Sequence, residues 1–221
     1  MKIPAYEQDG GRRLDELAAL PPSRRRNPNT YVEVRYTLAD GWDYLLVEVV
    51  YKNPTGQPVR PKTRAMLRTD GAWESGPGFG RRLFWSYNRW WGQAYGVLAQ
   101  GHRLEAKRRP RRENHLSYVP PEGRAPVIEP GGEFRITRRL IPGRNLFGVM
   151  TVAARLLDRP LRRAELTVRD PDGAVRAADV TARIGGEVYA AGRTDAEGRL
   201  EMNLPPKRCV LRVEAIGRPA K

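Results

Sequence analysis

Arginine and aromatic side chains are concentrated between residues 81 and 112, and this is the segment whose residue types could do chemistry. It holds nine basic residues and one acidic residue, Glu105. Its aromatic members, with one arginine among them, are Trp85, Tyr87, Arg89, Trp90 and Trp91. Guanidinium groups pair with phosphates and flat rings stack on nucleic-acid bases. The same rings pack on the apolar faces of sugars, so the segment is a candidate binding surface.

Three interpretations of this segment are open. The first is a groove for a polysaccharide or an anionic ligand, contacted by the aromatic residues and Arg89. The second is a nucleic-acid interface made by the basic residues, which are Arg81, Arg82, Arg103, Lys107, Arg108, Arg109, Arg111 and Arg112. In the third, the aromatic residues belong to the core and the arginine stems lie over them at a solvated rim. The sequence contains no recognised nucleic-acid-binding motif.

The residues that most enzymes and metal sites require are scarce. The chain has two histidines, His102 and His115, and one cysteine, Cys209, with no spacing typical of a zinc site. None of its serines lies in a Gly-X-Ser-X-Gly motif. The glycines between residues 76 and 80 lack the Gly-Lys-Ser/Thr of a phosphate loop. We therefore predict no metal, no cofactor and no catalytic residue, and a protein that is not an enzyme; Cys209 is expected in a strand, as a small buried side chain.

Composition and charge limit the remaining classes of protein. The 221 residues suit one large domain or two small ones, and 40% of them are hydrophobic, which is enough for a core. The formal net charge is +15, of which residues 165–221 carry only +1. No apolar run approaches the roughly 20 residues that span a bilayer. The start of the chain has no apolar signal segment, which predicts a cytoplasmic location, or an extracytoplasmic one if a signal was removed.

Alternation of apolar and polar residues predicts strands through much of the first 140 residues. A hairpin is expected from residues 31–38 and 45–51 around Asp40-Gly41. Further strands are expected at residues 63–69, 95–99 and 133–140, with loops at 71–80 and over most of 101–130. A helical spacing of apolar residues then predicts one short helix that begins after Asn145 and ends near Leu157.

Short strands separated by turns follow the predicted helix. They are expected at residues 166–169, 179–184, 188–192, 199–203 and 209–215. Glycine, proline and aspartate separate them, as in Asp172-Gly173 and Pro205-Pro206. This pattern is typical of a small antiparallel sandwich.

The last segment resembles the carboxypeptidase-regulatory-like module, a transthyretin-like β-sandwich. The resemblance lies in Leu166-Thr167-Val168-Arg169-Asp170, Ala178-Asp179-Val180, Arg193-Thr194-Asp195, Glu197-Gly198-Arg199-Leu200 and Leu204-Pro205-Pro206. The family usually has Gly and Tyr after the Pro-Pro turn, where this chain has Lys207-Arg208-Cys209. Such modules are generally non-catalytic spacers or adhesive units, so the resemblance implies a binding or scaffolding role.

A second, fainter resemblance links residues 31–157 to the β-rich region that precedes such a module in some PHP-type metal-dependent hydrolases. It lies in Asp43-Tyr44-Leu45-Leu46-Val47-Glu48-Val49, Tyr51-Lys52-Asn53-Pro54 and Gly92-Gln93-Ala94-Tyr95-Gly96. Those enzymes hold their metal through a His-X-His pair that this chain lacks. The resemblance therefore implies an accessory portion without the enzyme.

These patterns together predict a mainly β protein. A basic, proline-rich arm at residues 1–30 precedes a β-sandwich-like domain at 31–157, which ends in the helix. A small transthyretin-like β-sandwich follows at 163–217. The predicted function is a non-enzymatic binding or scaffold protein, carbohydrate-binding or accessory to a hydrolase system, with a polysaccharide, an anionic ligand or a partner protein as its target. Nucleic-acid binding through residues 81–112 is the alternative.

Overall fold

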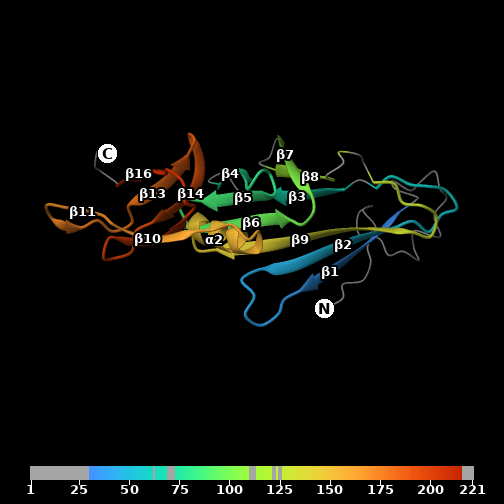
Figure 1. Ribbon diagram of the computed structural model, residues 1–221, viewed down its shortest axis with the longest axis horizontal. Helices are drawn as coiled ribbons and strands as arrows, with labels where there is room; N and C mark the ends of the chain where they lie inside the picture. The colour runs from blue at the N-terminus through green and yellow to red at the C-terminus, as the bar shows by residue number, and fades with distance from the viewer. Residues whose placement is uncertain are drawn as a thin grey trace. The chain divides into compact units, whose positions relative to one another are not determined.

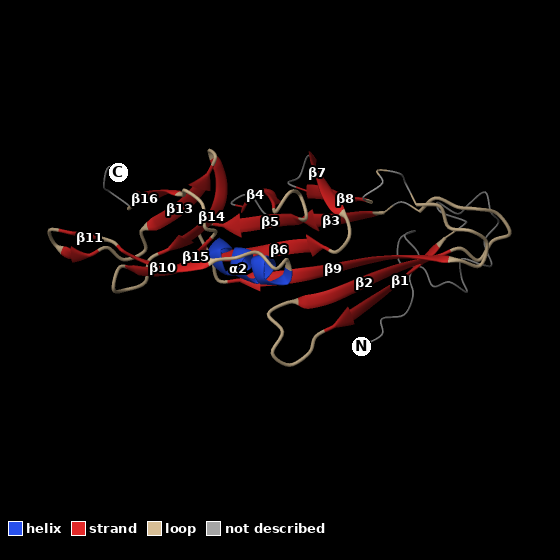
Figure 2. Cartoon of the chain, viewed as in Figure 1, coloured by secondary structure: helices blue, strands red, loops and turns tan. Residues whose placement is uncertain are grey.

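A computed structural model describes residues 30–61, 63–68, 73–109, 113–120, 123 and 126–215. The described residues form antiparallel β-sheets and one short helix, as Figures 1 and 2 show. The mainly β fold class with a single short helix is thus confirmed. The predicted arm at residues 1–30 lies almost entirely outside the described residues.

The first nine strands are β1 (Tyr31–Thr37), β2 (Leu45–Lys52), β3 (Arg64–Arg68), β4 (Trp73–Gly78), β5 (Leu83–Asn88), β6 (Gln93–Ala99), β7 (Arg103–Arg109), β8 (Glu113–Val119) and β9 (Glu133–Gly143). The helix α2 (Leu146–Leu156) follows. The remaining strands are β10 (Arg162–Thr167), β11 (Arg169–Asp170), β12 (Gly173–Ala174), β13 (Asp179–Ile184), β14 (Glu187–Arg193), β15 (Arg199–Leu204) and β16 (Val210–Glu214).

The described residues group into two compact units. The first contains residues 30–67, 98–109 and 113–140, and the second contains residues 73–97 and 141–215 together with Arg68. The second unit thus combines strands from the middle of the chain with α2 and all the strands after it. These ranges are not those of the two predicted sandwiches, 31–157 and 163–217, whose boundaries stay a prediction.

The first unit is built around the hairpin that the sequence predicts. β1 pairs with β2 in antiparallel register, so that Val32 lies opposite Tyr51 and Val34 opposite Val49. Val32, Val49 and Tyr51 are buried, as their alternation predicts, and Val50 is also buried, on the opposite face of β2. β2 pairs on its other side with β9. The hairpin and the strand at 133–140 are therefore confirmed, the latter extending to Gly143.

A second sheet of the first unit corrects a prediction. Residues 103–109 and 113–119 were expected to be loop, but they form β7 and β8, which pair with each other in antiparallel register. Leu104, Leu116 and Tyr118 are buried there and supply the apolar face. In β7 the buried Leu104 lies between the exposed Arg103 and Glu105, so this basic segment forms a strand and not irregular chain.

In the second unit, β5 lies between β4 and β6. The segment 71–80 was expected to be loop, whereas β4 occupies residues 73–78 of it. Gly76 lies opposite Trp85, and a Cβ on Gly76 would come within 2.7 Å of the Trp85 ring. The indole thus fills the space that a side chain would take. Pro77 is tolerated because β4 is an edge strand.

The helix α2 begins where its cap was predicted. Asn145 has an extended backbone, and its side-chain oxygen accepts a hydrogen bond of 2.9 Å from the Gly148 N–H. Phe147, Val149 and Met150 are buried on the face that packs against the second unit's strands. The helix contacts β5, β14 and β15, so it lies among the strands of the second unit.

The strands after α2 form two small antiparallel sheets and a short hairpin. β13 lies between β14 and β16, β10 pairs with β15, and β11 pairs with β12. All five predicted strands are present, with boundaries shifted by a few residues; the first begins four residues early. Within the described residues, no helix has the length and apolar character needed to cross a membrane.

Candidate ligand-binding site

Two adjacent tryptophans stand exposed on the turn between β5 and β6. Trp90 and Trp91 have exposed fractions of 71% and 69%. Among the described residues of the second unit, Val210 is the only other large hydrophobic side chain that is exposed. Large aromatic side chains are usually buried, so two neighbours in solvent mark a candidate contact surface.

Hydrogen bonds hold the backbone of this turn. The Trp91 N–H donates to the side-chain oxygen of Asn88, at 3.0 Å, and Asn88 itself is fully buried. The Arg193 guanidinium donates to the Trp90 carbonyl oxygen at 3.2 Å. Gly92 closes the turn with a φ of +64°, a conformation that favours glycine. The two indoles are therefore presented by a fixed backbone.

Carboxylates neutralise Arg89, which lies in the turn, and Arg193, which donates a hydrogen bond to it. Arg89 forms ion pairs of 3.1 Å with Glu74 and 3.3 Å with Glu214. Arg193 forms an ion pair of 2.6 Å with Asp179, and this hydrogen-bonded carboxylate raises the pKa of Arg193 above its usual range. The charges of these two arginines are thus balanced locally.

The structure separates the five residues predicted to contact a ligand. Trp85 and Tyr87 are buried within β5, and Trp85 donates a hydrogen bond of 3.1 Å to the Pro77 carbonyl oxygen. Burial raises the pKa of the Tyr87 hydroxyl, and the Asp179 carboxylate raises it further. These two aromatics form part of the core, as the third interpretation expected. Arg89 is partly exposed and ion-paired, and Trp90 and Trp91 are the exposed members of the set.

The basic residues of the nucleic-acid alternative do not form one described patch. Arg81 and Arg82 belong to the second unit, whereas Arg103 and Lys107 belong to the first. Arg108 and Arg109 lie in β7, and the structure describes their backbones but not their side chains. Arg111 and Arg112 lie outside the described residues. The alternative stays a prediction.

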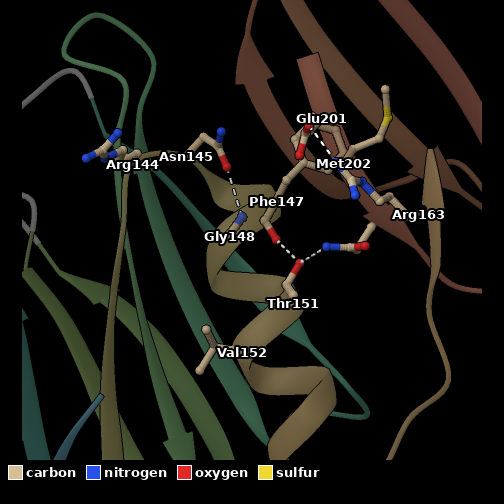
Figure 3. A pocket seen from close by; sticks show the side chains of 10 residues that line it. Arg144, Asn145, Phe147, Gly148, Thr151, Val152, Arg163, Glu201 and Met202 are labelled. Carbon is tan, nitrogen blue, oxygen red and sulfur yellow. Dashed lines mark hydrogen bonds and ion pairs between the residues drawn. The ribbon is translucent and has the colours of Figure 1, made fainter. Parts of the chain in front are cut away.

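A cavity of about 390 Å³ lies beside the first half of α2. Figure 3 shows Asn145 at the start of the helix and Thr151 further along it, with Arg163 and Glu201 on the neighbouring strands. Arg163 and Glu201 form an ion pair of 2.7 Å. Thr151 donates to the Phe147 carbonyl oxygen at 2.8 Å and accepts from the Asn203 side chain at 3.3 Å.

Sequence reasoning missed this cavity because its walls come from distant parts of the chain. Thr151 and Asn203 are separated by 52 positions and meet only when β15 packs against α2. Asn145 was identified, but as a helix cap. Neither the spacing nor the type of these residues carries a local signal of a shared site.

Groups suited to metal or nucleophilic chemistry are not clustered in the described part of the chain. No three His, Cys, Asp or Glu side chains there lie close enough to hold a metal ion. Cys209 is half-buried and lies just before β16, not within a strand as predicted. Burial raises the pKa of its thiol, which lowers the fraction of reactive thiolate.

Comparisons with known proteins find similarity in structure and not in sequence. No protein-family model matches the sequence, and no curated protein sequence matches it. A solved structure of a polysaccharide lyase is similar over 88% of this chain and 33% of that chain, with a TM-score of 0.44 and 9% sequence identity. This chain therefore spans about a third of the length of that protein. A similarity at this level assigns no function to the chain.

The comparison does correct one prediction. The sequence led us to expect a protein that is not an enzyme, and the structurally similar protein is named as an enzyme. That expectation is withdrawn, because the scarcity of familiar catalytic motifs does not exclude catalysis. The resemblance to the carboxypeptidase-regulatory-like module stays a prediction.

Proposed function

We propose that this protein binds carbohydrate through the turn that carries Trp90 and Trp91. The observation that carries the proposal is the exposure of both indoles, 71% and 69%, on a backbone fixed by hydrogen bonds. The faces of a pyranose ring present C–H groups, and these pack against the electron-rich face of an aromatic ring. A rigid turn loses little conformational entropy when a ligand binds, which favours affinity.

The local charge supports carbohydrate over nucleic acid as the ligand. Nucleic-acid binding needs cations that are free to neutralise phosphates. Arg89, which lies in the turn, and Arg193, which donates a hydrogen bond to it, already have carboxylate partners. A ligand with hydroxyl groups requires no such free charge. An accessory role in a hydrolase system, also expected from the sequence, stays a prediction.

Affinity electrophoresis against a panel of plant and bacterial polysaccharides tests the proposal. We expect at least one polysaccharide to retard the wild-type protein, and Trp90→Ala or Trp91→Ala to weaken binding by about tenfold or more, as truncation of a central aromatic residue does. Trp42→Ala is the matched control, since Trp42 is an exposed tryptophan in the other compact unit. Its binding should be unchanged.

Salt dependence separates the two classes of ligand. Carbohydrate binding through stacked rings should change little between 50 and 200 mM salt, whereas nucleic-acid binding falls by orders of magnitude over that range. The proposal fails if no polysaccharide retards the protein, or if Trp90→Ala and Trp91→Ala bind as the wild type does.

A further inference from the structure

The cavity beside α2 combines hydrogen-bonding groups with apolar walls. Phe147, Val152 and Met202 contribute apolar surface, while Asn145 and Asn203 contribute side-chain amides. Sugars bind where planar polar side chains reach their hydroxyl groups and an apolar surface covers their C–H groups. With a volume of about 390 Å³, the cavity lies at the small end of the range for ligand sites. That size suits one or two sugar rings.

Several polar groups at the cavity have hydrogen-bonding capacity that the described residues do not use. Asn145 accepts a hydrogen bond through its oxygen, and its NH₂ group has no acceptor among these residues. Asn203 donates through its NH₂ group, and its oxygen has no donor among them. The Arg144 guanidinium likewise forms no ion pair within the described part of the chain. The cavity thus offers both donors and an acceptor, the combination that a hydroxyl group can satisfy.

The cavity and the tryptophan turn are neighbours within the same compact unit. A Cβ on Gly92, the residue after Trp91, would come within 3.7 Å of the Arg144 carbonyl oxygen. On β14, a Cβ on Gly192 would lie 3.2 Å from the Phe147 ring. The next residue, Arg193, donates to the Trp90 carbonyl oxygen. The turn therefore adjoins the residues that line the cavity.

We propose that the cavity is a second sugar subsite, which binds one residue of the carbohydrate that stacks on Trp90 and Trp91. This inference rests on the proposed function and adds recognition of hydroxyl groups to it. The tryptophan turn supplies stacking, which discriminates little between sugars. The amides of Asn145 and Asn203 read the positions of hydroxyl groups, so the cavity sets which sugar is bound.

Nuclear magnetic resonance with single sugars tests the cavity separately from the turn. The probes are the methyl glycosides of glucose, galactose, mannose, xylose and glucuronic acid, each titrated to millimolar concentration. We expect at least one to shift the side-chain amide signals of Asn145 and Asn203 and the methyl signal of Met202. Trp90→Ala should leave these shifts in place, because the cavity residues are unchanged.

Variants of the cavity complete the test. Arg144→Ala and Asn203→Ala should each weaken the binding of that sugar by about tenfold, a free-energy change of about 1.4 kcal/mol. Arg176→Ala is the matched control, since Arg176 is exposed in the same unit and does not line the cavity. Arg144 is exposed, so its truncation keeps the fold intact and the result interpretable even if Asn203→Ala unfolds.

Two negative results have different meanings. If no sugar shifts the cavity signals while Trp90→Ala abolishes polysaccharide binding, the second subsite is wrong and the proposed function stands. If a sugar shifts the cavity signals while Trp90→Ala binds polysaccharide normally, the role of the tryptophan turn is wrong and the cavity remains a sugar site. Equal shifts in wild type and in Arg144→Ala and Asn203→Ala would also overturn the inference.

Discussion

The guanidinium of Arg193 donates a hydrogen bond to the carbonyl oxygen of Trp90, a residue 103 positions earlier in the chain. Arg193 ends β14, and Trp90 lies on the turn after β5. The same guanidinium is held by Asp179 on β13, at 2.6 Å. The sheet of the C-terminal strands therefore fixes the backbone that presents the exposed tryptophans. Under the proposed function, ligand affinity and the packing of these strands are coupled through one side chain.

Replacing Arg193 should reduce carbohydrate affinity without removing any group that contacts the ligand. In Arg193→Ala, the turn loses its bond at Trp90, and Asp179 loses its ion pair. We expect binding to weaken by about threefold to tenfold and the free energy of unfolding to fall by about 1 kcal/mol, a modest value because the pair is partly exposed. Isothermal titration with the retained polysaccharide and urea denaturation measure the two effects.

Arg183→Ala is the matched control for this variant. Arg183 also donates to a backbone carbonyl oxygen, that of Gly186, but this bond lies within its own hairpin. Its removal should leave carbohydrate affinity unchanged. Equal affinity in Arg193→Ala and Arg183→Ala would show that the turn does not depend on Arg193.

Gly76 is required by the tryptophan opposite it. In Gly76→Ala, the new methyl group would lie 2.7 Å from the Trp85 ring, which is buried and cannot move freely. We expect the free energy of unfolding to fall by about 1–3 kcal/mol, as it does when a packed core is overfilled. Urea denaturation measures the loss. Gly56→Ala is the control, because no atom lies within 4 Å of a Cβ there, and a loss of similar size in that variant would contradict the explanation.

This pair also shows why sequence patterns failed at β4. Alternation of side chains predicted β1, β2 and β9, where both faces carry side chains of contrasting polarity. In β4 the positions Gly76 and Gly78 have no side chain, and Trp85 and Leu83 of β5 provide the packing. The apolar side chains that would identify β4 as a strand belong to its neighbour β5. Composition alone therefore indicated a loop.

The candidate site was predictable only in part, for a related reason. The sequence identifies the aromatic residues from Trp85 to Trp91 but not which of them are exposed. That outcome depends on where β5 ends, since Trp85 lies within the strand and Trp90 beyond it. The cavity beside α2 gave no signal at all, because Thr151 and Asn203 are brought together by tertiary packing.

The cap of α2 gives a further prediction. Asn145→Ala removes the acceptor for the Gly148 N–H, and we expect the free energy of unfolding to fall by about 1 kcal/mol. Asn145→Asp keeps an oxygen in the same place and should retain most of the stability. Thermal unfolding followed by circular dichroism measures both variants. Equal stability of Asn145→Ala and the wild type would mean that water or another group caps the helix as well as Asn145 does.

Glu33 should make stability depend on pH in acid. Its carboxylate accepts hydrogen bonds of 2.7 Å from Arg35 and 2.9 Å from Lys52. These bonds, with that from Arg35 the larger cause, lower the pKa of Glu33 from 4.5 to about 2. Because the folded pKa lies below the unfolded one, the charged carboxylate stabilises the fold above pH 4.5, and this stabilisation is lost as the pH falls toward about 2.

Glu33→Gln tests this linkage directly, because it removes the titrating group and keeps the shape of the side chain. We expect the unfolding midpoint of the variant to lie below that of the wild type at neutral pH, with the difference shrinking between pH 4.5 and about 2. Glu105→Gln is the control, since Glu105 is exposed on β7 and has no ion pair among the described residues. A difference between wild type and Glu33→Gln that stays constant down to pH 2 would mean that Glu33 acts through its shape and hydrogen-bonding groups, and that its charge contributes nothing to the hairpin of β1 and β2.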